Sequence, residues 1–87
     1  MKIRTKEYGT VNVIGRRVEA LRLERGIRQL DFIARLQSAG LDINPTSYSK
    51  LEGQLRVARD LEVYYIARVL GVDIQELFSD FVRMQGN

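Results

Sequence analysis

The chain has 87 residues, enough for one domain with a modest core. It is 45% hydrophobic and 29% charged, a balance typical of globular and not of disordered proteins. The absence of cysteine excludes disulfides and thiolate metal sites, and the absence of histidine removes the commonest general base and metal ligand. We therefore expect no metal, no cofactor and no enzymatic activity.

No run of apolar residues approaches the about 20 that a membrane-spanning helix needs. The opening residues, MKIRTKEYG, also lack the apolar segment of a signal peptide. We expect no membrane partner and a cytoplasmic location.

The net charge of +3 is unevenly distributed along the chain. Residues 1–43 hold nine Lys and Arg against five Asp and Glu, whereas residues 44–87 hold five against six. An excess of positive charge in one half favours a polyanionic partner, and a solubilising surface explains it equally well.

The N-terminal residues 1–12 show no hydrophobic period, and we expect an extended arm there, with a short strand through Tyr8 and Val11 as the alternative. Lys2, Arg4 and Lys6 would let this arm follow a DNA groove, and a frayed terminus explains these residues equally well. From residue 13 the apolar residues recur with helical spacing, which predicts a first helix that ends at Gly26. Its apolar face is formed by Ile14, Val18 and Leu21. A second helix is predicted over about residues 28–40, with an apolar face of Phe32, Ile33 and Leu36.

The dipeptide Asn44-Pro45 predicts the start of a third helix, because Asn caps free amide groups and Pro fits the first helical position. This helix should run to about residue 52. A fourth helix is expected over residues 60–71. Asp73 should cap a short fifth helix, with Glu76 completing a capping box.

The sequence thus predicts a compact all-α bundle of five short helices. The arm covers residues 1–12, the helical domain covers residues 13–78, and residues 79–87 form a tail that keeps Phe81 and Val82 and then frays.

The order of IGRRVEALRLERG, GIRQLDFIARL, TSYSKLEG and IARVLGVDIQELF resembles the phage-repressor (Cro/XRE-type) helix-turn-helix family over about residues 14–78. The resemblance implies a lambda-repressor-like DNA-binding domain whose third helix reads the major groove. It also implies that Gln29 binds a phosphate or positions the reading helix, and that Arg22 pairs with Glu52. The span between Gln29 and Glu52 is several residues longer than in compact phage repressors, and Ile33 stands where the family usually has alanine. The chain therefore resembles a variant with an extended turn.

The third helix carries one small, polar face. Thr46, Ser49 and Lys50 fall on the side opposite Tyr48 and Leu51. Hydroxyl groups can bond to base edges, and lysine favours guanine. We predict that these three residues read bases, and the alternative is an ordinary solvated face.

Five further residues are candidates for phosphate contacts besides Gln29. Asn44 and Ser47 lie at the helix N-terminus, where amides and the helix dipole favour anions, although simple capping also explains them. Arg28, Arg56 and Arg59 flank the third helix, and ordinary surface charge is their alternative.

The leading hypothesis is a sequence-specific DNA-binding transcriptional regulator that acts on double-stranded DNA as a homodimer. An apolar patch would join the two copies through Tyr64, Tyr65, Phe78, Phe81 and Val82. The alternative is the same fold used as an antitoxin or adaptor, with a protein partner on that surface. An enzyme fits poorly, because the neighbouring Ser49 and Lys50 diverge by about 100° on a helix.

Overall fold

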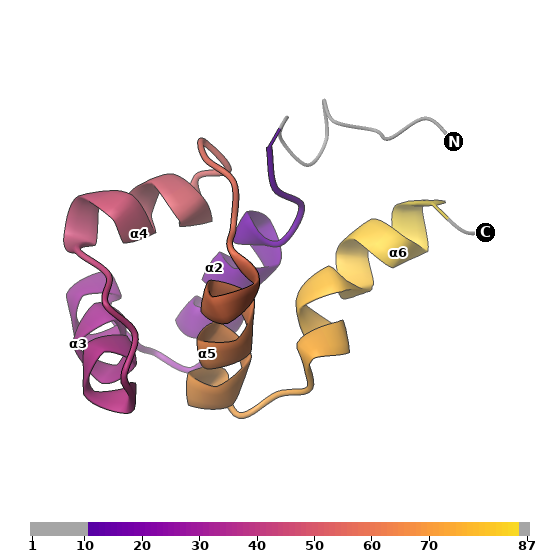
Figure 1. The fold of residues 1–87 in the computed structure, drawn as a ribbon. Helices are drawn as coiled ribbons and strands as arrows, with labels where there is room; N and C mark the ends of the chain where they lie inside the picture. The colour runs from indigo at the N-terminus through magenta and orange to yellow at the C-terminus, as the bar shows by residue number, and fades with distance from the viewer. Residues whose placement is uncertain (1–10, 86–87) are drawn as a thin grey trace.

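The computed structural model describes residues 11–85, and every regular element in that range is helical (Figure 1). The elements are α2 (Gly15–Glu24), α3 (Gln29–Ala39), α4 (Pro45–Glu52), α5 (Asp60–Leu70), the 3₁₀ helix η1 (Ile74–Phe78) and α6 (Ser79–Gln85). The prediction of an all-α chain is confirmed for residues 11–85. The predicted roles of Lys2, Arg4, Lys6 and Tyr8 lie outside the described residues.

The helices form an elongated body of 38 × 22 × 21 Å. In Figure 1, α3 and α4 lie at one end and α6 projects from the opposite end. The apolar faces predicted for the first three helices supply most of the core, as helical periodicity requires. The buried apolar side chains of the helices and of Ile14, which precedes α2, include Ile14, Val18, Leu21, Phe32, Ile33, Leu36, Tyr48, Leu51, Ile66, Leu70 and Leu77.

Two of the helix ends show how local backbone geometry follows from sequence. Gly26 closes α2 with a φ of 67°, in the left-handed region that a residue without a Cβ enters readily. The end of α4 differs, because Gly53 has a φ of −79° and the following Gln54 takes the left-handed conformation with a φ of 62°.

The predicted end of the chain needs correction. The capping box of Asp73 and Glu76 is not formed, because no side chain caps η1 and the Glu76 carboxylate pairs with Arg17 instead. Ile74, the first residue of η1, is 46% exposed although it is apolar. Residues Ser79–Gln85 of the predicted tail form a helix, α6, which the sequence does not predict, and none of its residues is buried.

Asn12, assigned to the arm from the sequence, is buried and joins α2 to α4. Its Oδ1 accepts hydrogen bonds from the N–H groups of Ile14 (3.1 Å) and Gly15 (2.9 Å). Its Nδ2 donates to the carbonyl oxygens of Leu51 (3.0 Å) and Arg56 (2.8 Å). One amide therefore satisfies free donors at the start of α2, an acceptor at the end of α4 and another in the loop that follows it.

Gly15 sits where α2 approaches α4 most tightly. A Cβ placed on it would lie 2.6 Å from the carbonyl oxygens of both Leu51 and Glu52. These oxygens belong to the main chain and cannot rotate away, so any larger residue would push the two helices apart.

We predict that Gly15→Ala lowers the free energy of unfolding by about 1–3 kcal/mol through overpacking. Urea denaturation measures the loss, and amide hydrogen exchange should show faster exchange in α4. Gly26→Ala is the control, because its φ of 67° strains the backbone locally while nothing lies within 4 Å of the added methyl group. That variant should leave exchange in α4 unchanged. A Gly15→Ala protein as stable as the parent would contradict the close approach.

Candidate functional site

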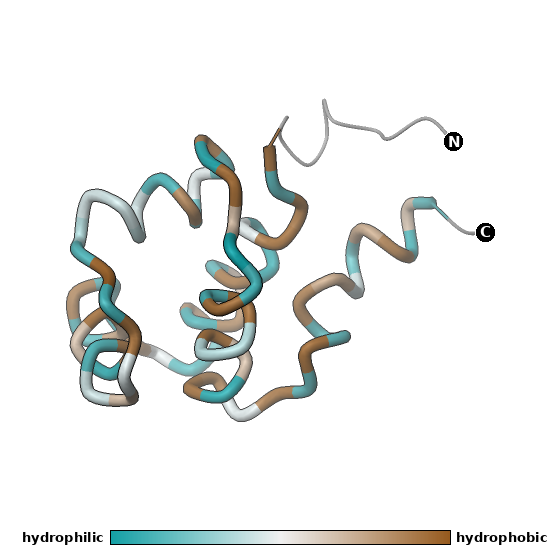
Figure 2. Tube along the Cα trace, in the orientation of Figure 1, coloured by the Kyte–Doolittle hydropathy of each residue, from teal (hydrophilic) through white to brown (hydrophobic). Residues whose placement is uncertain are grey.

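The polar face predicted for the third helix lies exposed on α4. Asn44 begins the helix by accepting a hydrogen bond from the Ser47 N–H at 2.8 Å, and Pro45 occupies the first turn. Thr46, Ser49 and Lys50 are all exposed, whereas Tyr48 and Leu51 on the opposite face are fully buried. Figure 2 shows α4 pale to teal over most of its length. The structure thus brings the three proposed reading residues together on one accessible face.

The last residue of α4, Glu52, is held by a buried ion pair to α2. Arg22 donates from Nε to Oε2 at 2.8 Å and from Nη2 to Oε1 at 3.0 Å, the two-bond geometry of a matched guanidinium and carboxylate. Both residues are 6% exposed. The pair implied by the resemblance is therefore present.

Three further hydrogen bonds complete this cluster. Gln29, at the start of α3, donates to Glu52 Oε1 at 3.0 Å, and the Tyr48 hydroxyl donates to Oε2 at 2.6 Å. Arg22 also donates to the carbonyl of Ile27 at 2.8 Å, in the turn between α2 and α3. Of the two roles that the resemblance implied for Gln29, this geometry supports positioning of α4.

The cluster shifts the ionisation of its members. Burial alone would raise the pKa of Glu52, but hydrogen bonds from Arg22, Tyr48 and Gln29 outweigh it and hold that pKa below its usual value. Burial and the bond to Glu52 raise the pKa of Tyr48 far above its ordinary range. The Tyr48 hydroxyl therefore stays protonated and continues to donate.

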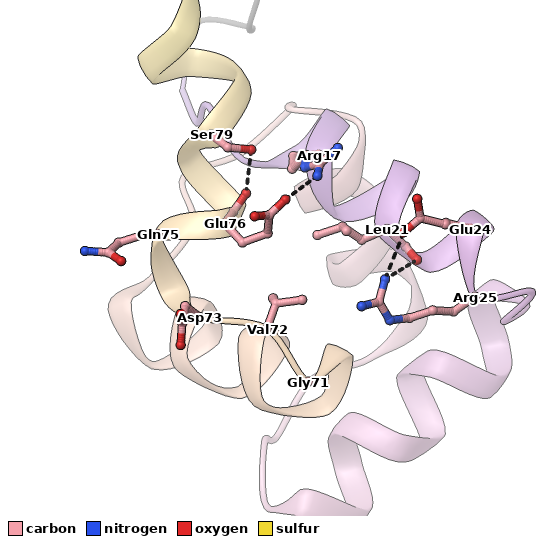
Figure 3. A pocket seen from close by; sticks show the side chains of 10 residues that line it. All are labelled: Arg17, Leu21, Glu24, Arg25, Gly71, Val72, Asp73, Gln75, Glu76 and Ser79. Carbon is pink, nitrogen blue, oxygen red and sulfur yellow. Dashed lines mark hydrogen bonds and ion pairs between the residues drawn. The ribbon is translucent and has the colours of Figure 1, made fainter.

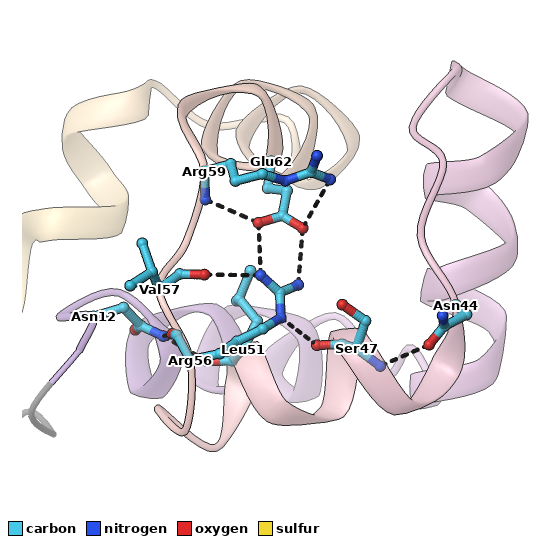
Figure 4. A network of polar contacts seen from close by, with 8 residues as sticks. All are labelled: Asn12, Asn44, Ser47, Leu51, Arg56, Val57, Arg59 and Glu62. Carbon is cyan, nitrogen blue, oxygen red and sulfur yellow. Dashed lines mark hydrogen bonds and ion pairs between the residues drawn. The ribbon is translucent and has the colours of Figure 1, made fainter.

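A second buried carboxylate, Glu62 in α5, lies 1% exposed opposite Arg56 (Figure 4). Arg56 donates to Glu62 Oε1 at 2.9 Å and to Oε2 at 2.8 Å. The Arg59 N–H also donates to Oε1 at 2.9 Å. Burial again acts to raise the pKa of Glu62, and the bonds from Arg56 and Arg59 bring it below its usual value.

Arg56 also bonds to the main chain, which separates it from the other candidate phosphate ligands. Its Nε donates to the Ser47 carbonyl at 2.8 Å and its Nη1 donates to the Val57 carbonyl at 2.8 Å. With the two bonds to Glu62, four of its five N–H groups have partners inside the protein. This role could not be predicted from the sequence, since an arginine in a polar loop looks like a surface charge.

Arg28 and Arg59 keep accessible side chains. Arg28 is 89% exposed at the side chain, with its nearest carboxylate that of Asp31 at 3.6 Å. The Arg59 side chain is 58% exposed and approaches Glu62 at 3.4 Å. Both remain available for an anion outside the protein.

The residues proposed for an apolar patch occupy two places. Tyr64 is 46% exposed, packs edge-on against Tyr65 at 5.2 Å between ring centroids, and lines a groove with Val72 and Ile74. Val82, 60% exposed, lies on α6 beside the half-buried Phe81. The half-buried Phe78 packs against the core.

A larger hollow, about 800 Å³, lies between α2 and the segment around η1 (Figure 3). Arg17 pairs with Glu76 across it, and Arg25 pairs with Glu24 at 3.3 Å. Four of the charged groups that line this hollow are therefore paired with each other within the protein. Within residues 11–85 there is no group of acidic residues arranged to hold a metal ion. No helix in the same range has the length and hydropathy needed to cross a bilayer.

Comparison of the chain with protein-family models, with curated proteins and with solved structures finds no match.

We predict that Glu52→Gln lowers the free energy of unfolding at pH 7 by about 3–5 kcal/mol, because it leaves the buried Arg22 without its counter-charge. In this variant the free energy of unfolding should also depend less on pH in the acid range. The pKa of Glu52 is depressed in the folded state, so its contribution is complete above the unfolded value of about 4.3 and is lost as pH falls through the lower folded value.

Urea denaturation between pH 2 and pH 7 measures both effects. Asp42→Asn, an exposed change in the connector before α4, removes the same charge outside the cluster and should leave the profile close to that of the parent. Equal pH profiles for the parent and Glu52→Gln would contradict the account.

Proposed function

We propose that the protein is a sequence-specific DNA-binding regulator that places α4 in the major groove of double-stranded DNA. The observation that carries the proposal is the exposed face of Thr46, Ser49 and Lys50 on a helix whose other face is anchored in the core. A major groove admits a helix, and hydroxyl and ammonium groups can distinguish its base edges.

The surroundings of α4 suit the phosphate backbone. Arg28 is the residue before α3, and no side chain caps the first amides of that helix. Arg59 is exposed at the start of α5. Positive charge and free amides at helix starts favour phosphate. Asn44 and Ser47 are used for capping, so only their exposed groups remain for DNA. The lambda-repressor-like fold and the homodimer expected from the sequence are part of this proposal.

Lys50→Ala should remove about 1–3 kcal/mol of discrimination between an enriched duplex and a scrambled one, because the lysine would contact base edges. Arg28→Ala should weaken binding to both duplexes alike and reduce the log–log salt slope by about 0.9, the value for one lost phosphate contact. Enrichment from a random duplex pool supplies the target, and titrations at two salt concentrations give affinity and slope. Arg35→Ala, an exposed charge change on the outer face of α3, is a control in the same assay.

A second function, as an antitoxin or adaptor that binds another protein, is favoured by the exposed apolar side chains of Tyr64, Ile74 and Val82. Such exposed side chains can form part of a protein interface. Absence of any duplex affinity at low salt would reject DNA binding and leave this alternative.

A further inference from the structure

The Arg56 guanidinium lies in the loop between α4 and α5 and bonds to both helices. One side of it bonds to the carbonyl of Ser47, in the first half of α4, and the other side bonds to the carboxylate of Glu62, in the first turn of α5. Figure 4 shows the guanidinium lying between the two helices, with bonds to both. We refer to this link, from Ser47 through Arg56 to Glu62, as the strut.

The α4 helix needs such a support. It has eight residues, and isolated helices shorter than about 12 residues are marginal in water. The cluster around Glu52 holds its C-terminal end, and the buried ring of Tyr48, near its middle, packs against Phe32. The bond from Arg56 to Ser47 supplies a fixed point in its N-terminal half.

The strut is also rigid. Glu62 is 1% exposed and the Arg56 side chain is 22% exposed, so water competes poorly for their bonds. The Arg59 N–H fixes the same carboxylate from a third direction at 2.9 Å. Arg56 is thus held at once by Ser47 of α4 and by Glu62 of α5, and it links the positions of these two residues.

We propose that Arg56 and Glu62 are positioning residues, which orient the face of Thr46, Ser49 and Lys50 without touching DNA themselves. This inference rests on the proposed function. It separates Arg56 from Arg28 and Arg59, because loss of Arg56 should reduce sequence discrimination and leave the salt dependence of binding unchanged. A phosphate ligand would behave in the opposite way.

The test uses a double variant, Arg56→Met with Glu62→Leu, which removes both charges together and avoids a stranded buried ion. Exchange of a buried ion pair for apolar residues of similar size is often neutral for stability. The double variant should keep the melting temperature of the parent while losing the bond to Ser47. Arg56→Lys is a second variant, which keeps the charge beside Glu62 but cannot make the bidentate bonds and reach Ser47 together.

Two measurements on the full chain test whether Arg56 and Glu62 orient α4. Without DNA, amide hydrogen exchange in the first half of α4 should rise about tenfold or more, while exchange in α2 and α3 is unchanged. With DNA, the ratio of affinities for the enriched and scrambled duplexes should fall about tenfold, and the log–log salt slope should stay within about half a unit of the parent value. Arg59→Ala is the control: it touches the same carboxylate but should leave exchange in α4 unchanged and lower the slope.

Exchange and discrimination equal to those of the parent would overturn the proposal. A salt slope reduced by about 0.9 in the double variant would also overturn it, by showing that Arg56 contacts phosphate. If the parent discriminates between no duplexes, the proposed function fails, and unchanged exchange in α4 still decides against the strut on its own.

Discussion

The orientation of α4 depends on one carboxylate, that of Glu52. It accepts hydrogen bonds from Arg22 of α2, Gln29 of α3 and Tyr48 one turn earlier in its own helix. A carboxylate has about four lone-pair positions, so these donors use nearly all of its capacity. Because Glu52 ends α4, the same contacts fix where that helix stands relative to α2 and α3. A buried charge without these partners would be strongly unfavourable, which leaves one stable arrangement.

The remaining contacts of α4 follow from that arrangement. Gly15 lets α2 come close enough for Arg22 to reach the carboxylate, and Asn12 satisfies main-chain groups of both helices at the crossing. Arg56 then holds the first half of α4 against α5. Every one of these contacts lies on the inner side of α4. The outer side is left with short polar side chains and a lysine, on a helix that cannot easily move.

The sequence predicted the helices well because their periodicity and end signals are local. Asn44 and Gly26 act within a few residues, so their roles could be read from the chain alone. The pairing of Arg22 with Glu52 came from a resemblance. Asn12 and Arg56 could not be assigned in this way, since their partners are defined only once α4 has docked. Asn12, for example, bonds to a carbonyl 39 positions away in the chain. Charge and polarity look the same in a sequence whether a side chain faces water or a buried carboxylate.

The most direct test of the account is a map of which amides respond to DNA. The ¹H–¹⁵N spectrum of the labelled protein would be followed while a short random-sequence duplex pool is added at low salt. If α4 reads DNA, the largest chemical-shift changes should fall on the amides of Thr46, Ser49 and Lys50 and at the start of α3, on the accessible side of the molecule. Shifts confined to the surface of Tyr64 and Val82, or no shifts at all, would contradict it.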